Sequence, residues 1–246
     1  MAVYFISDIH LKPEGDARTD RLLRWLKSLR DIRELYLMGD IFDFWMGGHA
    51  VWLHRYRGVV GAFRELQSRG VVIHFFEGNH DIHIDPFFTK ELGVSVSVEP
   101  KVKNFCGYQV RLEHGDLFDP TDRGYFFLRG LLRSRAIRWT SIHAPGGLVT
   151  LISDWATAAS HKRTSVAGRR PEVVEDIRRK MRLYFEKASF EEDFDLLIMG
   201  HTHVREDFTE VLGGRTRRFV NLGSWYDNSP HAFVIDGNRR ESVPIP

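Results

Sequence analysis

Five short apolar runs in the sequence end abruptly in Asp, Asn or His, usually beside a glycine. Residues 71–76 illustrate the pattern, because Gly78, Asn79, His80 and Asp81 follow them almost at once. Short apolar runs that alternate with helical segments are typical of an α/β protein. The ends of such strands meet at one edge of a sheet, and the loops at that edge hold active sites. The pattern therefore predicts an α/β fold with a reaction centre at the strand ends.

The order of the predicted elements supports this fold class. Leucines at helical spacing predict a helix over 16–30, and a second helix over 50–69 is closed by Gly70. The stretch 121–190 has no strand signal and is expected to be helical. The expected strands are residues 2–7, 35–38, 71–76, 108–113, 195–199, 218–222 and 232–235.

Charge divides the chain into two parts. Residues 123–187 carry 14 Lys and Arg against 5 Asp and Glu, although the net charge of the whole chain is only +2. We therefore expect a core formed by residues 1–120 and 191–246, with residues 121–190 inserted as a helical cap. A basic surface suits phosphates or an anionic membrane. The near-neutral total gives no reason to expect a nucleic-acid partner, although the basic insert leaves nucleic-acid binding open as an alternative.

Cys106 is the only cysteine, so no intramolecular disulfide can form, which fits a reducing cytoplasm. The first ten residues, MAVYFISDIH, lack the basic segment of a signal peptide and reach Asp8 too early for one. No stretch approaches 18 uninterrupted apolar residues, the length that would suggest a membrane span. The sequence therefore predicts a cytoplasmic protein.

The polar residues at the strand ends are of the types that hold metal ions. Residues at i and i+2 on extended backbone point to the same side, so Asp8 with His10, and His201 with His203, can each present two ligands. Each motif alone is more often a turn, but their joint occurrence at successive strand ends favours a metal site. Seven candidates are too many for one tetrahedral ion and suit two ions about 3.5–4 Å apart. They are Asp8, His10, Asp40, Asn79, His114, His201 and His203.

The series D-x-H, G-D-x-x-D, G-N-H-D, H-G-D and G-H-T-H resembles the calcineurin-like metallophosphoesterase superfamily. The resemblance implies two facing mixed β-sheets flanked by helices and a centre of two divalent ions, with Mn²⁺ as the expected metal. It assigns Asp8, His10, Asp40 and His203 to one ion. It assigns Asp40, Asn79, His114 and His201 to the other, so that Asp40 bridges the two.

The same resemblance implies catalytic roles for His80 and Asp43. His80 would stabilise the phosphoryl group or protonate the leaving group, and Asp43 would orient it. A carboxylate beside the imidazole would raise the pKa of His80. Two cations would make hydroxide available near neutral pH for in-line attack on phosphorus.

Three further stretches resemble the bacterial UDP-2,3-diacylglucosamine pyrophosphohydrolases of lipid A synthesis: GDIFDFWMGG, HGDLFDPTDRGYFFLRGLLR and FVNLGSWYDN. That resemblance implies hydrolysis of the pyrophosphate to UMP and 2,3-diacylglucosamine 1-phosphate, with a helical cap that shelters the acyl chains. Some of these enzymes have Arg and Glu where this chain keeps His80 and Asp43. The substrate-contacting residues that the resemblance implies are Asn79, His80, Asp122, Tyr125 and Ser160.

Other interpretations stay open at this stage. The substrate could instead be a nucleotide, another phosphodiester or another lipid-linked pyrophosphate. Residues 44–46 could serve core packing, and His83 and Asp85 are expected on a loop surface. The basic, apolar insert is expected to bind an anionic membrane surface, which would make the protein peripheral to the inner face of that membrane.

Overall fold

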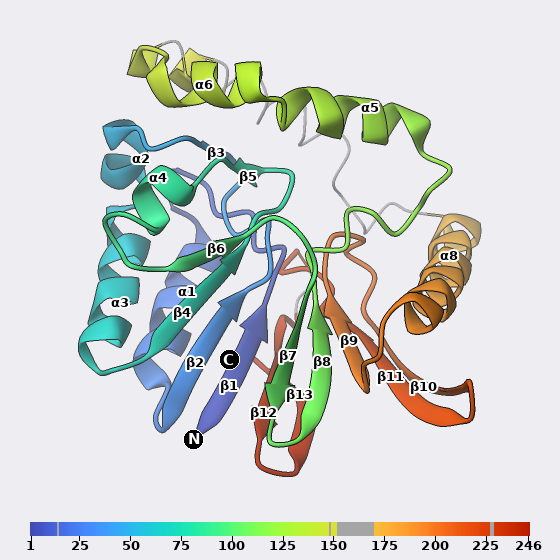
Figure 1. Cartoon of the computed structure of the whole chain (residues 1–246). Helices are drawn as coiled ribbons and strands as arrows, with labels where there is room; N and C mark the ends of the chain where they lie inside the picture. The colour runs from blue at the N-terminus through green and yellow to red at the C-terminus, as the bar shows by residue number, and fades with distance from the viewer. Residues whose placement is uncertain (14, 148, 152–169, 227–228) are drawn as a thin grey trace.

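The computed structural model describes the chain except for residues 14, 148, 152–169 and 227–228. Two large β-sheets pack face to face, with helices on their outer sides (Figure 1). Both sheets contain parallel and antiparallel pairs of strands. The predicted fold, two facing mixed sheets flanked by helices, is confirmed.

The first sheet has six strands in the order β13-β12-β1-β2-β4-β6. Its four strands β1, β2, β4 and β6 are parallel, whereas β12 and β13 are antiparallel to their neighbours. The strands are β1 (Ala2–Ile6), β2 (Ile32–Leu37), β4 (Val72–Phe76), β6 (Ser95–Ser97), β12 (His231–Asp236) and β13 (Arg239–Pro244).

The second sheet has five strands in the order β10-β11-β9-β8-β7. Its central strand β9 is parallel to both neighbours, and the two edge strands are antiparallel. A short parallel pair, β3 (Trp45–Met46) and β5 (Asp81–Ile82), follows the two loops that carry Asp40 and Asn79. The strands of the second sheet are β7 (Lys101–Phe105), β8 (Tyr108–Leu112), β9 (Leu196–Met199), β10 (Glu206–Leu212) and β11 (Arg215–Asn221).

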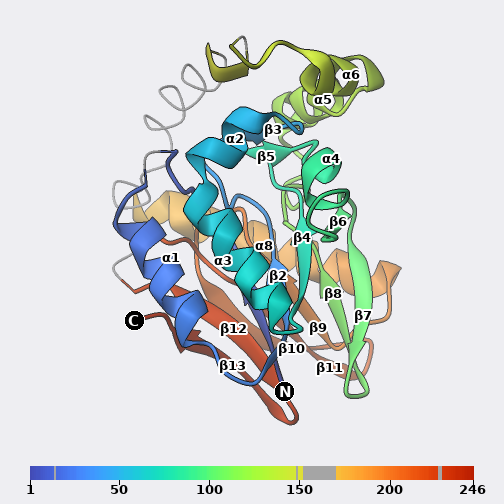
Figure 2. The ribbon, with the colours of Figure 1, turned by 90° about the vertical axis from the view of Figure 1, so that its left-hand side faces the viewer.

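Alternation along the strands divides the apolar residues between three core regions. Phe5 of β1 points between the sheets, where it packs with Val110 and Ile198 of the second sheet. Ile6 points the other way, towards α1 (Ala17–Ser28) and α3 (Arg57–Ser68), which cover the outer face of the first sheet (Figure 2). Helix α8 (Pro171–Glu191) covers the outer face of the second sheet, where Phe185 is fully buried. The strands are therefore held on both faces.

Some elements differ from the expectations. The predicted helix over 50–69 is two helices, α2 (Ala50–Arg55) and α3, which meet at Tyr56. The Tyr56 hydroxyl donates to the carbonyls of Leu11 and Phe44, so this residue ties the helix junction to the loops beside it. The edge strands β6, β7, β10 and β13 were not expected. Charged residues along β7, β10 and β13 leave only a weak apolar pattern, and β6 is only three residues long with serine at both ends. A short helix α4 (Asp85–Phe88) follows β5.

The predicted helical insertion contains two kinds of helix. Helices α5 (Arg123–Leu132) and α6 (Arg135–His143) lie across the ends of the sheets, at the top of Figure 1. Helix α8 instead packs along the second sheet, because Met181 and Phe185 are buried against Phe194 and Phe219. The boundaries at 121 and 190 stay a prediction, and we use "cap" below for α5 and α6. Among the described residues, no helix is long and apolar enough to cross a membrane.

Candidate metal centre

The loops after β1, β2 and β9 bring four predicted ligands together. Side-chain donor atoms of Asp8, His10, Asp40 and His203 all lie within 4.8 Å of one another. All four side chains are buried. The Nε2 atoms of His10 and His203 are 3.1 Å apart. Both rings also face carboxylates, since His203 Nε2 lies 3.4 Å from Asp8 Oδ1 and His10 Nε2 lies 3.8 Å from Asp40 Oδ2.

A second group shares Asp40 with the first. Asp40, His114 and His201 also have donor atoms within 4.8 Å of one another. The side-chain oxygen of Asn79 lies between the two rings, 3.3 Å from His114 Nε2 and 3.0 Å from His201 Nδ1. The structure thus brings all seven predicted ligands into two adjacent groups joined by one carboxylate.

The donors fit divalent ions. Imidazole nitrogens with carboxylate and amide oxygens suit ions such as Mn²⁺, Fe²⁺ and Zn²⁺. Two imidazole nitrogens that face each other and also face carboxylates could both bind one cation. The Nδ1 atoms of His10 and His203 are buried without a hydrogen-bond partner among the described residues. The residues present therefore suit a metal centre, which is the arrangement the sequence predicts.

The backbone at the site is unusual in a way that the glycines of the motifs help to explain. Five of the seven residues have a positive φ, a conformation that costs roughly 1–2 kcal/mol for a non-glycine residue and is typical of functional sites. A Cβ atom at Gly78 would overlap the Asp40 carboxylate, and one at Gly200 would overlap that of Asp8. These glycines let the loops approach each other closely. The five residues are Asp8 (φ 51°), His10 (51°), Asp40 (54°), His201 (68°) and His203 (62°).

The buried charges shift one another's proton affinities. Burial opposes ionisation of Asp40, but His114, His80 and His10 lower its pKa to about 2. Burial likewise opposes a charge on His114, but Asp40 and Asp8 raise its pKa to about 9. Burial and the neighbouring His114 lower the pKa of His201 to about 4. The acidic residues of the group therefore favour positive charge at its centre.

His80 lies beside the metal-binding groups. Its Nδ1 is 2.8 Å from the main-chain carbonyl of Asp43. A carbonyl oxygen can only accept, so Nδ1 carries the proton and Nε2 remains for chemistry. Burial opposes the charge on His80, but Asp40 and the Asp43 carbonyl raise its pKa. The expected rise in pKa is present, and the Asp43 carboxylate lies within 4.8 Å of both His80 and His10.

Asp81 fixes the loops that carry the ligands. Its carboxylate accepts from the backbone N–H groups of Asp40, Ile41 and Gly78 at 2.7–3.0 Å. The Asp40 Oδ1 atom in turn accepts from the N–H groups of Asn79 and His80, each at 2.9 Å. The two aspartates therefore lock the loops after β2 and β4 together, as suits a site that must be rigid.

The predicted substrate contacts on the cap side have separate places. Asp122 is exposed and accepts from the Tyr125 N–H at 2.8 Å, so it caps the start of α5. The Tyr125 hydroxyl donates to Asp116 at 2.8 Å, and its ring lies 5.8 Å from that of His201. The structure brings Tyr125 to the metal groups and leaves Asp122 at the helix end. Ser160 lies outside the described residues.

The expectation of a surface position was wrong for His83, and Asp85 is only half-buried. His83 is only 3% exposed, and its Nδ1 is 2.8 Å from Ser141 Oγ on α6. Asp85 is paired with Arg138 of α6 at 2.7 Å. Both residues were expected on a loop surface. The cap covers His83, whereas Asp85 begins α4 with its side chain 34% exposed. The sequence of the loop contains no sign of this, because the partners lie more than 50 residues further along the chain.

The residues at 44–46 and 224–226 also have defined places. Trp45 is fully buried and packs on Tyr56 and Phe87, so it serves core packing. The backbone N–H of Trp225 donates to the Asp8 carbonyl at 3.1 Å, which puts this stretch beside the site. Tyr226 was missed as an individual residue. Its ring lies 5.6 Å from that of His10 and 6.0 Å from that of His203, with the Arg18 guanidinium 4.4 Å away.

Two cavities have Asn79 in their linings. One has a volume of about 280 Å³ and is lined by site residues, among them His10, His80 and His203. The other, of about 200 Å³, lies under α5 and is lined by Asn79, Ile82, Leu128 and Leu132 together with Tyr125, Arg129 and Arg133. The first cavity thus contains predicted metal ligands, the second is more apolar, and Asn79 belongs to both.

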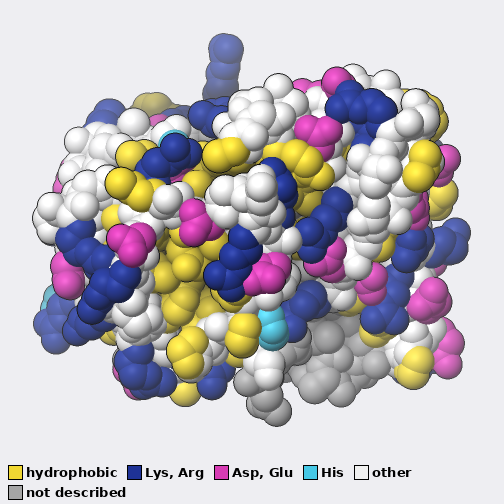
Figure 3. Space-filling model, turned by 90° about the horizontal axis from the view of Figure 1, so that it is seen from below, with side chains coloured by type: hydrophobic (Ala, Val, Ile, Leu, Met, Phe, Trp, Pro, Cys, Tyr) yellow, Lys and Arg dark blue, Asp and Glu magenta, His cyan; other side chains and the backbone are white. Residues whose placement is uncertain are grey.

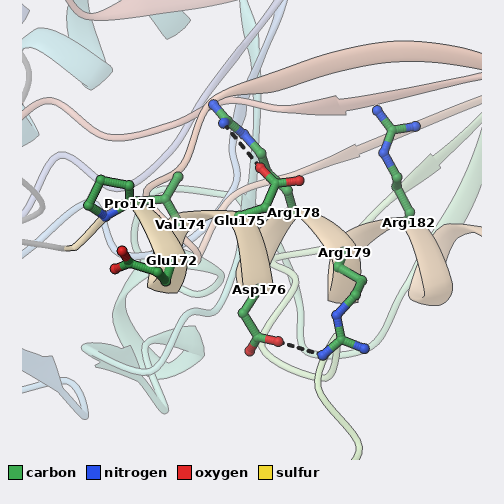
Figure 4. A pocket seen from close by; sticks show the side chains of 8 residues that line it. All are labelled: Pro171, Glu172, Val174, Glu175, Asp176, Arg178, Arg179 and Arg182. Carbon is green, nitrogen blue, oxygen red and sulfur yellow. Dashed lines mark hydrogen bonds and ion pairs between the residues drawn. The ribbon is translucent and has the colours of Figure 1, made fainter.

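A cavity of about 1000 Å³ along the first half of α8 lies apart from this chemistry. Figure 4 shows that charged side chains there pair with one another along the helix. Glu175 is 3.6 Å from Arg178, and Asp176 is 2.5 Å from Arg179. These exposed acidic and basic side chains already pair with one another, and such pairs contribute little energy. We therefore assign no ligand site to this cavity.

Comparison with known proteins agrees with this geometry. The family model described as calcineurin-like phosphoesterase matches residues 1–205. A UDP-2,3-diacylglucosamine hydrolase of Aeromonas salmonicida is 31% identical, over 98% of this chain and 92% of its own. One from Pseudomonas aeruginosa is 30% identical over the whole of both chains. One from Porphyromonas gingivalis is 31% identical, over 96% of this chain and 94% of its own.

Proposed function

The chain belongs to the calcineurin-like phosphoesterase family, and we propose that it hydrolyses the pyrophosphate bond of UDP-2,3-diacylglucosamine. The products would be UMP and 2,3-diacylglucosamine 1-phosphate. The relatives that share its full length carry the name of this activity. The observation that carries the proposal is that Asn79 lines both the cavity at the metal-binding groups and the cavity under α5, since this substrate joins phosphates to two apolar chains.

We propose two divalent ions, with Mn²⁺ as the metal. Asp8, His10 and His203 would hold one ion, and Asn79, His114 and His201 the other, with Asp40 shared between them. When bound, the ions supply positive charge for the phosphate oxygens and a water that ionises near neutral pH. The carboxylates of this chain balance that charge, and Asp40 and Asp81 keep the donor loops in place.

His80 is our proposed catalytic residue. The Asp43 carbonyl holds its Nδ1–H, so that Nε2 is available to donate to a phosphate oxygen or to the leaving group when the ring is charged. The raised pKa of His80 favours that charged form. Asp43 acts as its positioning residue.

On the substrate side, we propose contacts from Asn79, His80 and Tyr125, whose side chains line the two cavities. Asp122 and Ser160 remain in the proposal on the family resemblance alone. The exposed side chains of the cap, Phe127 at 76% and Trp139 at 65%, lie among arginines with no acidic residue between 123 and 143. We propose that this surface binds an anionic membrane at its cytoplasmic face, where a lipid-linked nucleotide would be presented.

The substrate is tested with the purified protein and Mn²⁺. We expect release of UMP from UDP-2,3-diacylglucosamine. If that substrate is untouched while simple phosphodiesters, nucleotides or another lipid-linked pyrophosphate are hydrolysed, the assignment fails and the alternative substrate class is correct. Asp40→Ala should abolish turnover, whereas Asp20→Asn, a change of charge in the exposed part of α1, should not alter it.

The division of roles has its own test. His80→Ala should slow turnover by about 10²–10⁴-fold, the usual contribution of a general acid. Because His80 is not among the proposed ligands, metal analysis should still find two ions per chain. Fewer than two ions in this variant would refute the separation of His80 from the metal ligands.

A further inference from the structure

Arg133, the residue that ends α5, reaches from the cap to the loop that carries Asn79 and His80. Its Nη1 donates to Glu77 Oε2 at 2.8 Å, and its Nη2 donates to the carbonyl of Gly78 at 3.0 Å. The Glu77 side chain is 1% exposed and that of Arg133 is 14% exposed. A buried ion pair of this kind is costly to break. If one partner is removed, the other charge stays buried with neither water nor an opposite charge to stabilise it.

Glu77 extends the contact across the whole loop. Its second oxygen, Oε1, accepts from the N–H of Ile84 at 2.9 Å. One carboxylate therefore joins the two ends of the segment 77–84 and receives the cap arginine at the same time. The middle of the segment is fixed by Asp40, which accepts from the N–H groups of Asn79 and His80.

The far end of the same loop is also joined to the cap. Asp85 pairs with Arg138 of α6, and His83 contacts Ser141 of α6. The Arg138 side chain is 40% exposed, so this pair contributes less than the buried one. The loop is thus held at both ends by α5 and α6, with Arg133 as the buried contact nearest to Asn79.

Arg133 is also part of the cavity under α5. That cavity is lined by Asn79, Leu128 and Arg133, so a group that enters it touches both the cap and the loop. Both terminal nitrogens of Arg133 already have acceptors in the protein. Its geometry is that of a residue that holds the loop rather than one that reaches for a phosphate.

We propose that Arg133 is a positioning residue: through Glu77 and the Gly78 carbonyl it holds Asn79 and His80 in place for the reaction, and it makes their position depend on α5. The proposal rests on phosphoester hydrolysis at this site as proposed above. It adds a residue of the cap, 56 positions beyond Glu77, to the machinery of the core.

The test compares Arg133→Gln with Arg217→Gln. Arg217 serves as the control because it is also buried, at 8% exposure, and also joins main-chain carbonyls, those of Glu192 and Phe194, to a carboxylate, that of Asp193. Its partners lie before β9, at the other end of that strand from His201. The substrate is bis-p-nitrophenyl phosphate with Mn²⁺, a small phosphodiester with no acyl chain to contact the cap.

We expect Arg133→Gln to lower kcat for the small phosphodiester by roughly 10–100-fold, the usual loss when a supporting contact is removed, with little change in KM. Hydrogen exchange of the amides in 78–84 should become faster. Arg217→Gln should keep kcat and the exchange of that segment. Arg133→Lys should recover part of the activity, since an ammonium can meet the carboxylate without matching both acceptors.

Two results would overturn the proposal. One is an Arg133→Gln protein that keeps its kcat for the small phosphodiester and loses activity only with UDP-2,3-diacylglucosamine, since Arg133 would then contact substrate. The other is unchanged exchange in 78–84. If Arg133→Gln alone folds poorly, the Arg133→Gln/Glu77→Gln double variant removes the unpaired buried charge, and the same two measurements decide.

The proposed role of Arg133 and the proposed substrate can fail independently of each other. A wild-type protein that hydrolyses the small phosphodiester but not UDP-2,3-diacylglucosamine would refute the substrate and leave the comparison of kcat values intact. If the small phosphodiester is not hydrolysed, the exchange of 78–84 in Arg133→Gln against Arg217→Gln still supports or refutes the positioning role.

Discussion

Helix α8 and the cap helices α5 and α6 come from one stretch without strand signal, yet they are attached to the core in different ways. Helix α8 buries Met181, Phe185 and Ala188 against the second sheet. Helix α5 has no fully buried residue, and Phe127 is 76% exposed. The cap is held mainly by polar contacts, among them Arg133 with Glu77 and His83 with Ser141.

Helix α8 and the cap also differ in the balance of their charged side chains. Helix α8 contains acids and bases that pair within the helix and with β10, as Arg182 does with Glu210. Residues 123–143 contain five arginines and no acidic residue. On the face of the molecule opposite the cap, Figure 3 shows side chains of both charges mixed together. The acidic and basic side chains of α8 balance one another, whereas the cap has an excess of positive charge and exposed apolar side chains.

The largest expected effect tests the packing of α8. Phe185 is fully buried, and its ring lies 5.5–6.1 Å from those of Phe194, Phe208 and Phe219. Phe185→Ala should lower the free energy of unfolding by about 3–5 kcal/mol, because it leaves a cavity in the core. Phe127→Ala on α5 should change it by less than about 0.5 kcal/mol. Denaturant unfolding measures both, and equal losses would remove the distinction between the two regions.

A smaller effect should separate the regions by pH. Burial lowers the pKa of His83 to about 4, with Arg138 and Arg133 adding to the decrease and Asp85 opposing it. Ser141 Oγ donates to the Arg138 carbonyl, so it accepts the His83 Nδ1 proton, and His83 Nε2 has no partner among the described residues. A second proton on the ring is therefore disfavoured in the folded state.

The lowered pKa of His83 decides how the free energy of unfolding changes with pH. The folded state binds the proton less readily than the unfolded state, so the contribution of His83 is complete above pH 6.5 and is lost as the pH falls towards 4. We expect a loss of about 1–3 kcal/mol, with α6 losing protection from hydrogen exchange at a higher pH than α8. His83→Gln should remove this difference. If α6 and α8 of the wild-type protein lose protection from hydrogen exchange at the same pH, the prediction for His83 is contradicted.

The smallest effect concerns the exposed surfaces. Phe127→Ala or Trp139→Ala should weaken binding to vesicles that contain anionic lipid by about 1–2 kcal/mol, roughly 5–30-fold, since each removes an exposed apolar group from the basic cap. Leu183→Ala removes an apolar group that is 54% exposed on the charge-balanced α8, so binding should not change. Sedimentation with vesicles measures all three variants. If the α8 variant and the cap variants lose vesicle binding equally, charge balance does not decide which surface binds the membrane.

Much of the fold and the candidate site could be predicted from the sequence. The buried strands β1, β2, β4 and β9 are short apolar runs, and polar residues follow each of them, beside a glycine after β2, β4 and β9. Burial of a strand and the turn after it are local properties, so their pattern is visible in the sequence. The edge strands β7 and β10 were missed because one of their faces is polar and their pairing depends on a neighbour.

The sequence by itself determined which residues stand at the strand ends, because that depends only on where each apolar run stops. It also indicated which residues of one sheet would share an edge, because parallel strands end on the same side of a sheet. The packing of the two sheets then decided that the strand ends of β8 and β9 meet those of β1, β2 and β4. Only the tertiary structure decided that His83 is buried, that Tyr226 lies over the site, and that Arg133 of the cap holds the loop of Asn79 and His80. Those contacts join segments far apart in the chain, and no local pattern encodes which long side chain reaches which carbonyl.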